Sequence, residues 1–437
     1  MRAVQFSRVS FRRRSARLGA SAAAGLAIAG VLLAGGAPGG ASAEASADGA
    51  GPGATAGGAD YPELPSADPF YRAPDPLPDV APGTVLRSRP VTVRGLGLPM
   101  PVSAWQVLYR STDATGRPNA VSGTVAMLDD GKSPASLGTA SRRLVAYNIG
   151  THGLASQCAP SFLLRKGEEF EEALMAGVVA RGWAIMVTDY EGQGTRGPHT
   201  YTSGLATGRA VLDGVRAALG LKDAGLGKGT PVGLWGYSEG GLASTWAAEL
   251  APTYAPELNL KGTATGGIPA RLLHTARKID GGPLSGFLLA AAVGLDRADP
   301  RMKLASLLNS DGREAVETIK SMCASDWMPR FANHPIHHYT NAPDPLALPQ
   351  VKAVIEANNL GRRTPADPMF IYEAVNDEFI PVEDVRGLVA TYCRRGVAVS
   401  YTEDPYGEHV SWAAQGAPVA LDWLAARFAG EKAPSTC

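Results

Sequence analysis

Apolar stretches of strand length alternate with longer stretches of helical pattern through much of this 437-residue chain. Two early strands and three later ones are predicted in the first half, with an Ala-rich helix at 206–219 before the last of them. Short strands that alternate with helices indicate an α/β protein with a mostly parallel central sheet. The predicted strands are 92–108, 120–126, 143–148, 184–189, 232–236, 369–372 and 397–401, and a late helix is predicted at 382–394.

Residues 262–358 interrupt this alternation, because they do not follow a strand–helix pattern. They contain an apolar run at 281–293 that is too short to cross a bilayer and more apolar than a surface helix. One interpretation is a helix buried between layers of the domain. The other is a helical lid or cap whose apolar face covers an apolar site.

The first 43 residues have the pattern of a secretory signal peptide. They hold six arginines and no acidic residue, and an apolar run at 18–33 precedes the A-x-A cleavage pattern that ends at Ala43. We therefore predict cleavage after Ala43 and a secreted, extracellular protein, with the general and twin-arginine export routes both open. An uncleaved membrane anchor is the alternative interpretation.

The rest of the chain is expected to form one large domain at 60–437, preceded by a flexible lead-in at 44–59 that is nearly all Ala, Gly and Ser. Its 45% hydrophobic content excludes a disordered chain. The 41 basic residues equal the 41 acidic ones, so no concentrated basic face is available for binding nucleic acid. No obligate protein partner is inferred.

Four cysteines, Cys158, Cys323, Cys393 and Cys437, are an even number in a chain expected to be exported, which favours disulfides. Spacing alone leaves all three pairings open. No C-x-x-C is present, so a zinc ribbon or a thioredoxin-like redox site has little support. A histidine-rich stretch at 334–338 is better explained as a surface loop than as a metal site, so neither a metal nor a cofactor is expected.

The pentapeptide at 236–240 reads Gly-Tyr-Ser-Glu-Gly and matches G-x-S-x-G. The match is weak by itself in a chain with 52 glycines. However, an apolar strand-like run precedes it and an Ala-rich helical stretch follows it, which is the setting of a nucleophile on a sharp strand-to-helix turn. Ser238 is therefore the predicted nucleophile.

A nucleophilic serine on this fold requires an acid and then a histidine later in the chain. Of the seven histidines, only His409 follows the last predicted strand, and it is the predicted general base. Asp377 lies in the loop after the preceding strand and is the predicted acid. Glu373, Glu378 and Asp404 are the local competitors for this role, and each is interpreted as a solvated or capping carboxylate.

Ester or amide cleavage also needs two donors for the oxyanion of the tetrahedral intermediate. One is normally the backbone N–H after the nucleophile, which here belongs to Glu239. The other is expected from the loop after an earlier strand, at 148–153, so His152 is predicted to act through its backbone rather than its ring.

These pieces together make the chain resemble the secretory lipase family of α/β-hydrolases, typified by Candida antarctica lipase A. The resemblance runs from about Asp68 to Cys437, nearly the whole expected mature chain, and is far more specific than G-x-S-x-G alone. Its motifs are Cys158-Ala159-Pro160-Ser161, Asp189-Tyr190-Glu191-Gly192, Gly236-Tyr237-Ser238, Ala255-Pro256-Glu257-Leu258-Asn259, Gly281-Gly282-Pro283 with Gly286-Phe287, Asp377-Glu378 with Pro381, and Glu408-His409.

The resemblance implies an α/β-hydrolase fold, with the insertion at 262–358 as a helical lid. It places the family's triad on Ser238, Asp377 and His409 and its oxyanion donors on Glu239 and His152, where the lipase itself has an aspartate. It further implies the disulfides Cys158–Cys323 and Cys393–Cys437. The tail that forms a flap in that lipase is absent, so its acyl-chain preference and interfacial behaviour are not carried over.

The expected function is a secreted serine hydrolase of carboxylic esters, a lipase that releases fatty acids from acylglycerols through an acyl-enzyme and can contact lipid interfaces. An esterase of smaller esters, metabolite esters or polyesters is the alternative. Two alternatives from other classes are a peptidase and a non-catalytic binding protein on a hydrolase scaffold, and the presence of all three triad candidates counts against the binding protein.

Overall fold

The computed structural model describes residues 61–129, 131 and 142–437. The expected signal peptide and lead-in lie outside the described residues. Within the described ranges, no helix combines the length and the apolar character needed to cross a membrane.

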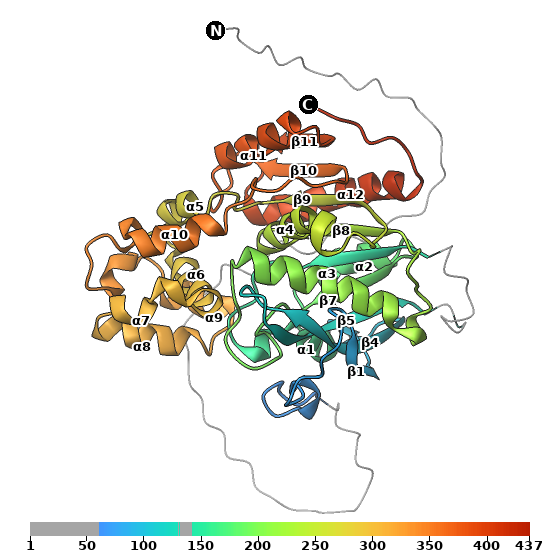
Figure 1. The fold of residues 1–437 in the computed structure, drawn as a ribbon, viewed down its shortest axis with the longest axis horizontal. Coiled ribbons are helices and arrows are strands. Elements are labelled where there is room, and N and C mark those ends of the chain that lie inside the picture. The colour runs from blue at the N-terminus through green and yellow to red at the C-terminus, as the bar shows by residue number, and fades with distance from the viewer. Residues whose placement is uncertain (1–60, 130, 132–141) are drawn as a thin grey trace, which may run out of the picture. The chain divides into compact units, whose positions relative to one another are not determined.

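A nine-stranded sheet forms the centre of the domain, in the order β1-β4-β5-β7-β6-β8-β9-β10-β11 (Figure 1). In this spatial order, each strand from β1 to β7 is antiparallel to its neighbour. From β7 through β6 to β11, each strand is parallel to its neighbour. The predicted mostly parallel sheet of an α/β protein is thus confirmed. The strands are β1 (Val85–Pro90), β4 (Val102–Thr112), β5 (Pro118–Leu128), β6 (Leu144–Asn148), β7 (Ala184–Thr188), β8 (Val232–Tyr237), β9 (Leu260–Gly266), β10 (Met369–Ala374) and β11 (Val399–Asp404).

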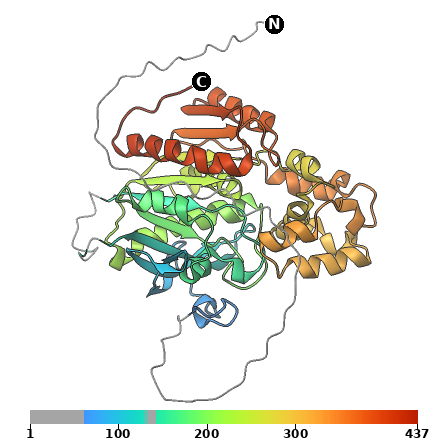
Figure 2. The same cartoon turned by 180° about the vertical axis from the view of Figure 1, so that it is seen from behind.

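Helices cover both faces of this sheet, as a fully buried parallel sheet requires. On one face α3 (Gly204–Gly220) packs against α4 (Glu239–Tyr254), and on the other α2 (Glu172–Val179) packs against α12 (His409–Phe428), which Figure 2 brings to the front. Strands β6, β7, β8 and β10 are buried along their whole length. The remaining helices of the sheet domain are α1 (Pro160–Lys166) and α11 (Val382–Arg394).

Six helices between β9 and β10 form a separate layer beside the sheet (Figure 1). We call residues 267–368 the cap. The cap has its own apolar core, in which Leu289, Ile319 and Trp327 are at most 1% exposed. The apolar run at 281–293 falls largely in α6 and packs inside this second core, so most of its apolar residues face other parts of the cap. The helices are α5 (Leu272–Ile279), α6 (Ser285–Ala298), α7 (Leu304–Leu307), α8 (Ser310–Ile319), α9 (Ala324–Arg330) and α10 (Pro349–Ala357).

Several details of the sequence-based prediction differ from the structure. The stretch at 92–108 is not one strand, because Leu96 and Gly97 both adopt positive φ and turn the chain into a small hairpin of β2 (Arg94–Gly95) and β3 (Leu98–Pro99) before β4 begins. Strand β9 was not predicted, since its sequence lacks an apolar run. Because β9 ends at Gly266, the expected boundary of the insertion at Gly262 lies inside a strand of the sheet.

Four loops that carry the predicted site residues follow β6, β8, β10 and β11. These strands run parallel, so their carboxyl ends meet at the same edge of the sheet. Ligands of open α/β sheets bind at this edge. The topology therefore brings residues more than a hundred positions apart to one place, beside the cap.

Candidate active site

Ser238 occupies a sharp turn between the last residue of β8 and the first residue of α4. Its φ of 60° and ψ of −122° are strained for a residue with a side chain. A Cβ on Gly240 would lie 1.8 Å from the carbonyl oxygen of Asn148, and one on Gly236 would lie 2.4 Å from that of Gly240. The two glycines of the pentapeptide are thus required by the close approach of β6, β8 and α4.

Replacing Gly240 by alanine is expected to destabilise the fold by about 1–3 kcal/mol or more, because the methyl group would overlap a backbone oxygen that cannot move without shifting β6. Denaturant unfolding measures the change. Gly220→Ala is the matched control, since Gly220 also lies in a helix and a Cβ there would contact nothing within 4 Å. Equal stability of the two variants would contradict the packing argument.

The structure brings the three predicted catalytic side chains into one hydrogen-bonded line. Ser238 Oγ lies 2.9 Å from His409 Nε2, and His409 Nδ1 lies 2.5 Å from Asp377 Oδ2. His409 is the first residue of α12, and its side chain is 7% exposed. In this geometry Nδ1–H donates to the carboxylate, which leaves Nε2 free to accept the serine proton.

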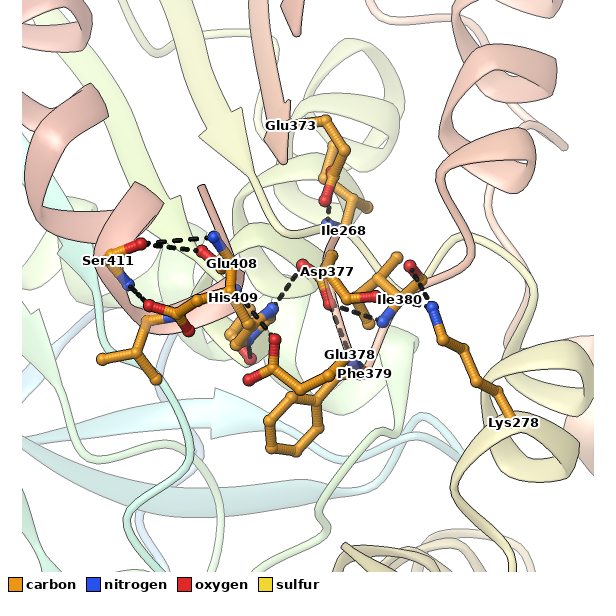
Figure 3. Close-up of polar contacts among 12 residues, drawn as sticks. Ile268, Lys278, Glu373, Asp377, Glu378, Phe379, Ile380, Glu408, His409 and Ser411 are labelled. Carbon is orange, nitrogen blue, oxygen red and sulfur yellow. Dashed lines mark hydrogen bonds and ion pairs between the residues drawn. The ribbon is translucent and has the colours of Figure 1, made fainter. Parts of the chain in front are cut away.

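Asp377 is held as an anion by several donors at once. Its Oδ1 accepts the backbone N–H groups of Phe379 (2.8 Å) and Ile380 (2.7 Å), as Figure 3 shows. Burial alone would raise the pKa of Asp377, but the hydrogen bond and charge of His409 and the two backbone donors outweigh it and lower that pKa. The carboxylate is therefore ionised at neutral pH and can stabilise a histidinium.

The three neighbouring carboxylates have different surroundings. Glu378 Oε2 accepts the backbone N–H of His409 (3.0 Å), and Asp404 Oδ1 accepts that of Tyr406 (2.9 Å), so both act as local caps, as interpreted from the sequence. For Glu373 that interpretation is wrong. Its side chain is fully buried, because every position of β10 is enclosed between β9 and β11 and the flanking helices.

The loop after β6 carries His152, whose ring is buried and has a hydrogen-bond partner at each nitrogen. Nδ1 lies 3.0 Å from the carbonyl oxygen of Gly150, and Nε2 lies 2.8 Å from Glu169 Oε1. Both nitrogens face acceptors, which suits a doubly protonated ring. Burial would lower the pKa of His152, but the charge and hydrogen bond of Glu169 raise it to about 9. The backbone of this loop is held as well, since Gly150 N–H donates to Glu171 (3.0 Å).

Glu239, the other predicted oxyanion residue, is the first residue of α4, where backbone N–H groups have no acceptor within the helix. Its side chain turns into the protein and lies 2.5 Å from His199 Nε2, and both side chains are at most 1% exposed. His199 Nδ1 lies 2.9 Å from the carbonyl oxygen of Glu191. The Glu239 carboxylate is therefore engaged elsewhere and only its backbone N–H remains for an oxyanion.

Sequence reasoning did not find Glu169, Glu171 and His199. Each is a common polar residue 17 to 40 positions from its partner, and no local spacing signal links them. Their roles follow only from burial and from the packing of separate loops.

The cap is tied directly to the loop of His152. Cys158, six residues after His152, forms a disulfide with Cys323 at the start of α9, with 5.5 Å between the Cα atoms. Ala324 N–H also donates to the carbonyl oxygen of His152 (2.9 Å). The second disulfide joins Cys393 of α11 to Cys437. These are the pairs that the resemblance implied.

A cavity of about 240 Å³ lies where the cap meets the loop of Asp377. Lys278, Ile279, Pro283 and Leu284 of the cap line it, together with Glu378. Lys278 Nζ donates to the backbone carbonyls of Asp377 (2.5 Å) and Ile380 (3.1 Å), which fixes α5 on this loop (Figure 3). A mostly apolar cavity beside the loop of Asp377 suits the hydrophobic part of a substrate.

His334 and His338 stack on each other in the cap, with 5.5 Å between ring centroids. Within the part of the chain that the structure describes, no group of three His, Cys, Asp or Glu side chains is arranged to hold a metal ion.

A family profile described as "Secretory lipase" matches residues 165–436. A probable inactive lipase of Mycobacterium tuberculosis is 38% identical over 85% of this chain and 84% of its own length. A secreted triacylglycerol lipase of Malassezia globosa is 32% identical over 86% and 83%. The crystal structure of Candida antarctica lipase A in its closed state superposes with a TM-score of 0.77 at 25% identity, covering 86% of this chain and 89% of that one.

Proposed function

This chain belongs to the secretory lipase family of carboxylic ester hydrolases, and from that premise we propose that it releases fatty acids from acylglycerols through an acyl-enzyme formed on Ser238. The single observation that carries the proposal is the line of contacts from Ser238 Oγ through the His409 ring to Asp377. A serine hydroxyl is a weak nucleophile until a neighbouring base removes its proton, and this arrangement supplies that base and orients it.

The proposed reaction has two halves. His409 Nε2 takes the proton of Ser238 as Oγ attacks the ester carbonyl, and the oxyanion is stabilised by the backbone N–H groups of Glu239 and His152. The histidinium then protonates the leaving alcohol, and the acyl group stays on Ser238. A water molecule, deprotonated by the same nitrogen, releases the fatty acid and restores the serine.

One relative carries the name of a probable inactive lipase. In the present chain the predicted nucleophile, base and acid are all present, and the base lies within hydrogen-bond distance of both the nucleophile and the acid. The Glu239–His199 pair holds the first turn of α4, and the His152–Glu169 pair holds the loop after β6. This arrangement favours an active hydrolase over a binding protein on a hydrolase scaffold.

We also propose that the protein is secreted and that cleavage after Ala43 gives a mature protein that starts at Glu44. The charge and cleavage pattern of residues 1–43, the two disulfides and the family support this.

The experiment that tests the proposal is hydrolysis of p-nitrophenyl esters of increasing acyl length by protein recovered from the culture medium. The N-terminal residue of the recovered protein is determined beforehand. Activity that rises toward long acyl chains is expected, together with stoichiometric labelling of Ser238 by a fluorophosphonate. A short-chain optimum would favour the esterase of smaller esters. Absence of both turnover and labelling would overturn the proposal, and an N-terminus other than Glu44 would overturn the cleavage site.

A further inference from the structure

A second carboxyl group lies buried behind the proposed catalytic acid. Glu373 is the fifth residue of β10, and its side chain is 0% exposed. Its Oε2 accepts the backbone N–H of Ile268 at 3.3 Å, and its carboxyl lies close enough to that of Asp377 for the Asp377 charge to act on it. Figure 3 shows the Glu373 carboxyl directed at the Ile268 backbone, on the side of the Asp377 loop.

The two oxygens of Glu373 differ in their surroundings. Among the described residues no donor reaches Oε1, although this atom is buried. An ionised carboxylate needs donors at both oxygens when water is excluded, whereas a protonated carboxyl needs only one acceptor for its own O–H. Asp377 is the acceptor within reach.

The charged and titratable groups around Glu373 do not favour a second anion. Burial raises the pKa values of Tyr237 of β8 and Tyr401 of β11, and the charge of the Glu373 carboxyl would add to both shifts. The nearby basic residues His409 and Lys278 contact Asp377 instead, at its carboxylate and its backbone carbonyl. Within the described ranges no ion pair compensates a charge on Glu373.

Two buried carboxyls in contact cannot both ionise without a large repulsion, so one of them keeps a proton. Asp377 accepts three hydrogen bonds, from His409 and from two backbone N–H groups, all of which favour its anion. Glu373 accepts a hydrogen bond from the backbone N–H of Ile268, and the backbone of Ala374 also favours its anion, but burial and the Asp377 charge outweigh both and raise its pKa well above the ordinary value. The proton therefore stays on Glu373.

We propose that Glu373 is a positioning residue that remains protonated and donates a hydrogen bond from Oε1 to the carboxylate of Asp377, which fixes that carboxylate against the His409 ring. The role rests on the proposed function, because it acts through the triad acid. The neutral donor restrains Asp377 without adding charge beside the histidine that must gain a proton during turnover.

Glutamine is the matched probe for this state. In Glu373→Gln the side-chain oxygen can accept from Ile268 and the amide can donate to Asp377, as in a protonated glutamate. Glu373→Leu has a similar size but removes both contacts. The two variants therefore separate the donor from the packing.

The first readout is stability against pH and does not need ester turnover. The pKa of Glu373 is raised in the folded state relative to about 4.3 in an unfolded chain, so folding takes up a proton above that pH. The folding constant of the wild type should therefore fall about tenfold per pH unit relative to Glu373→Gln, until the folded pKa is passed. Parallel curves, or a glutamine variant that does not fold, would overturn the proposal.

The second readout is the acid limb of kcat/KM, which reports the ionisation of His409. In Glu373→Gln the limb should keep its position, because a donor to Asp377 remains. In Glu373→Leu the limb should move to higher pH and kcat should fall about tenfold. The Asp377 carboxylate there loses the hydrogen-bond donor that partly neutralised its negative charge. If Glu373 were ionised, both variants would move the limb to lower pH. An enzyme without turnover would refute the proposed function. The stability measurement would then still decide whether Glu373 is protonated.

Discussion

Replacing Ser238 by alanine is expected to lower kcat for ester hydrolysis by roughly 10⁵–10⁶-fold, since the variant has no atom that can form the acyl-enzyme. The residual rate would come from the oxyanion donors and from substrate binding alone. The fold should be retained, because Ser238 makes no side-chain cap to α4 and its Oγ contacts only His409 among the described side chains.

The measurement is kcat together with fluorophosphonate labelling and the unfolding midpoint. Ser66→Ala is the control, because Ser66 is exposed and has no recorded hydrogen bond. Ser238→Ala should lose both turnover and fluorophosphonate labelling while its unfolding midpoint stays unchanged. Ser66→Ala should keep the wild-type turnover, labelling and midpoint. Turnover within tenfold of the wild type would exclude Ser238 as the nucleophile.

Replacing both Cys158 and Cys323 by alanine is expected to cost about 5 kcal/mol of unfolding free energy, estimated from the entropy of closing a loop of 165 residues. The same estimate for the 44-residue loop of Cys393–Cys437 is about 4 kcal/mol. Cys158 is fully buried beside Gly153, so loss of its packing adds to the larger effect.

The two double variants are compared with the wild type by guanidinium unfolding. Only the first should also lower kcat, because Cys158–Cys323 holds the cap against the loop of His152, where Ala324 N–H contacts the His152 carbonyl. A larger loss of stability for the Cys393–Cys437 variant would contradict the loop-closure argument. Unchanged kcat in the Cys158–Cys323 variant would show that the His152 loop is held without the cap.

Much of the fold could be predicted because its signals are local. The strand before Ser238 and the helix after it are visible as an apolar run and an Ala-rich stretch, and the glycines at 236 and 240 mark the turn between them. Strand β9 was missed, because its residues Leu260–Gly266 are small or polar and become a central strand only through neighbours β8 and β10. The hairpin at Leu96 was missed because its turn lies inside a stretch of otherwise strand-like composition.

The sequence by itself determined the order of the chemical groups: a serine on a strand-to-helix turn, then an aspartate, then a histidine, each after a predicted strand. That order is encoded within short segments, so spacing and residue type are enough to read it. Only the tertiary structure decided which polar groups are buried together, such as His152 with Glu169, Glu239 with His199 and Glu373 with Asp377. Protonation depends on water exclusion and on partners distant in sequence, and both arise only when the loops at the end of the sheet pack beneath the cap.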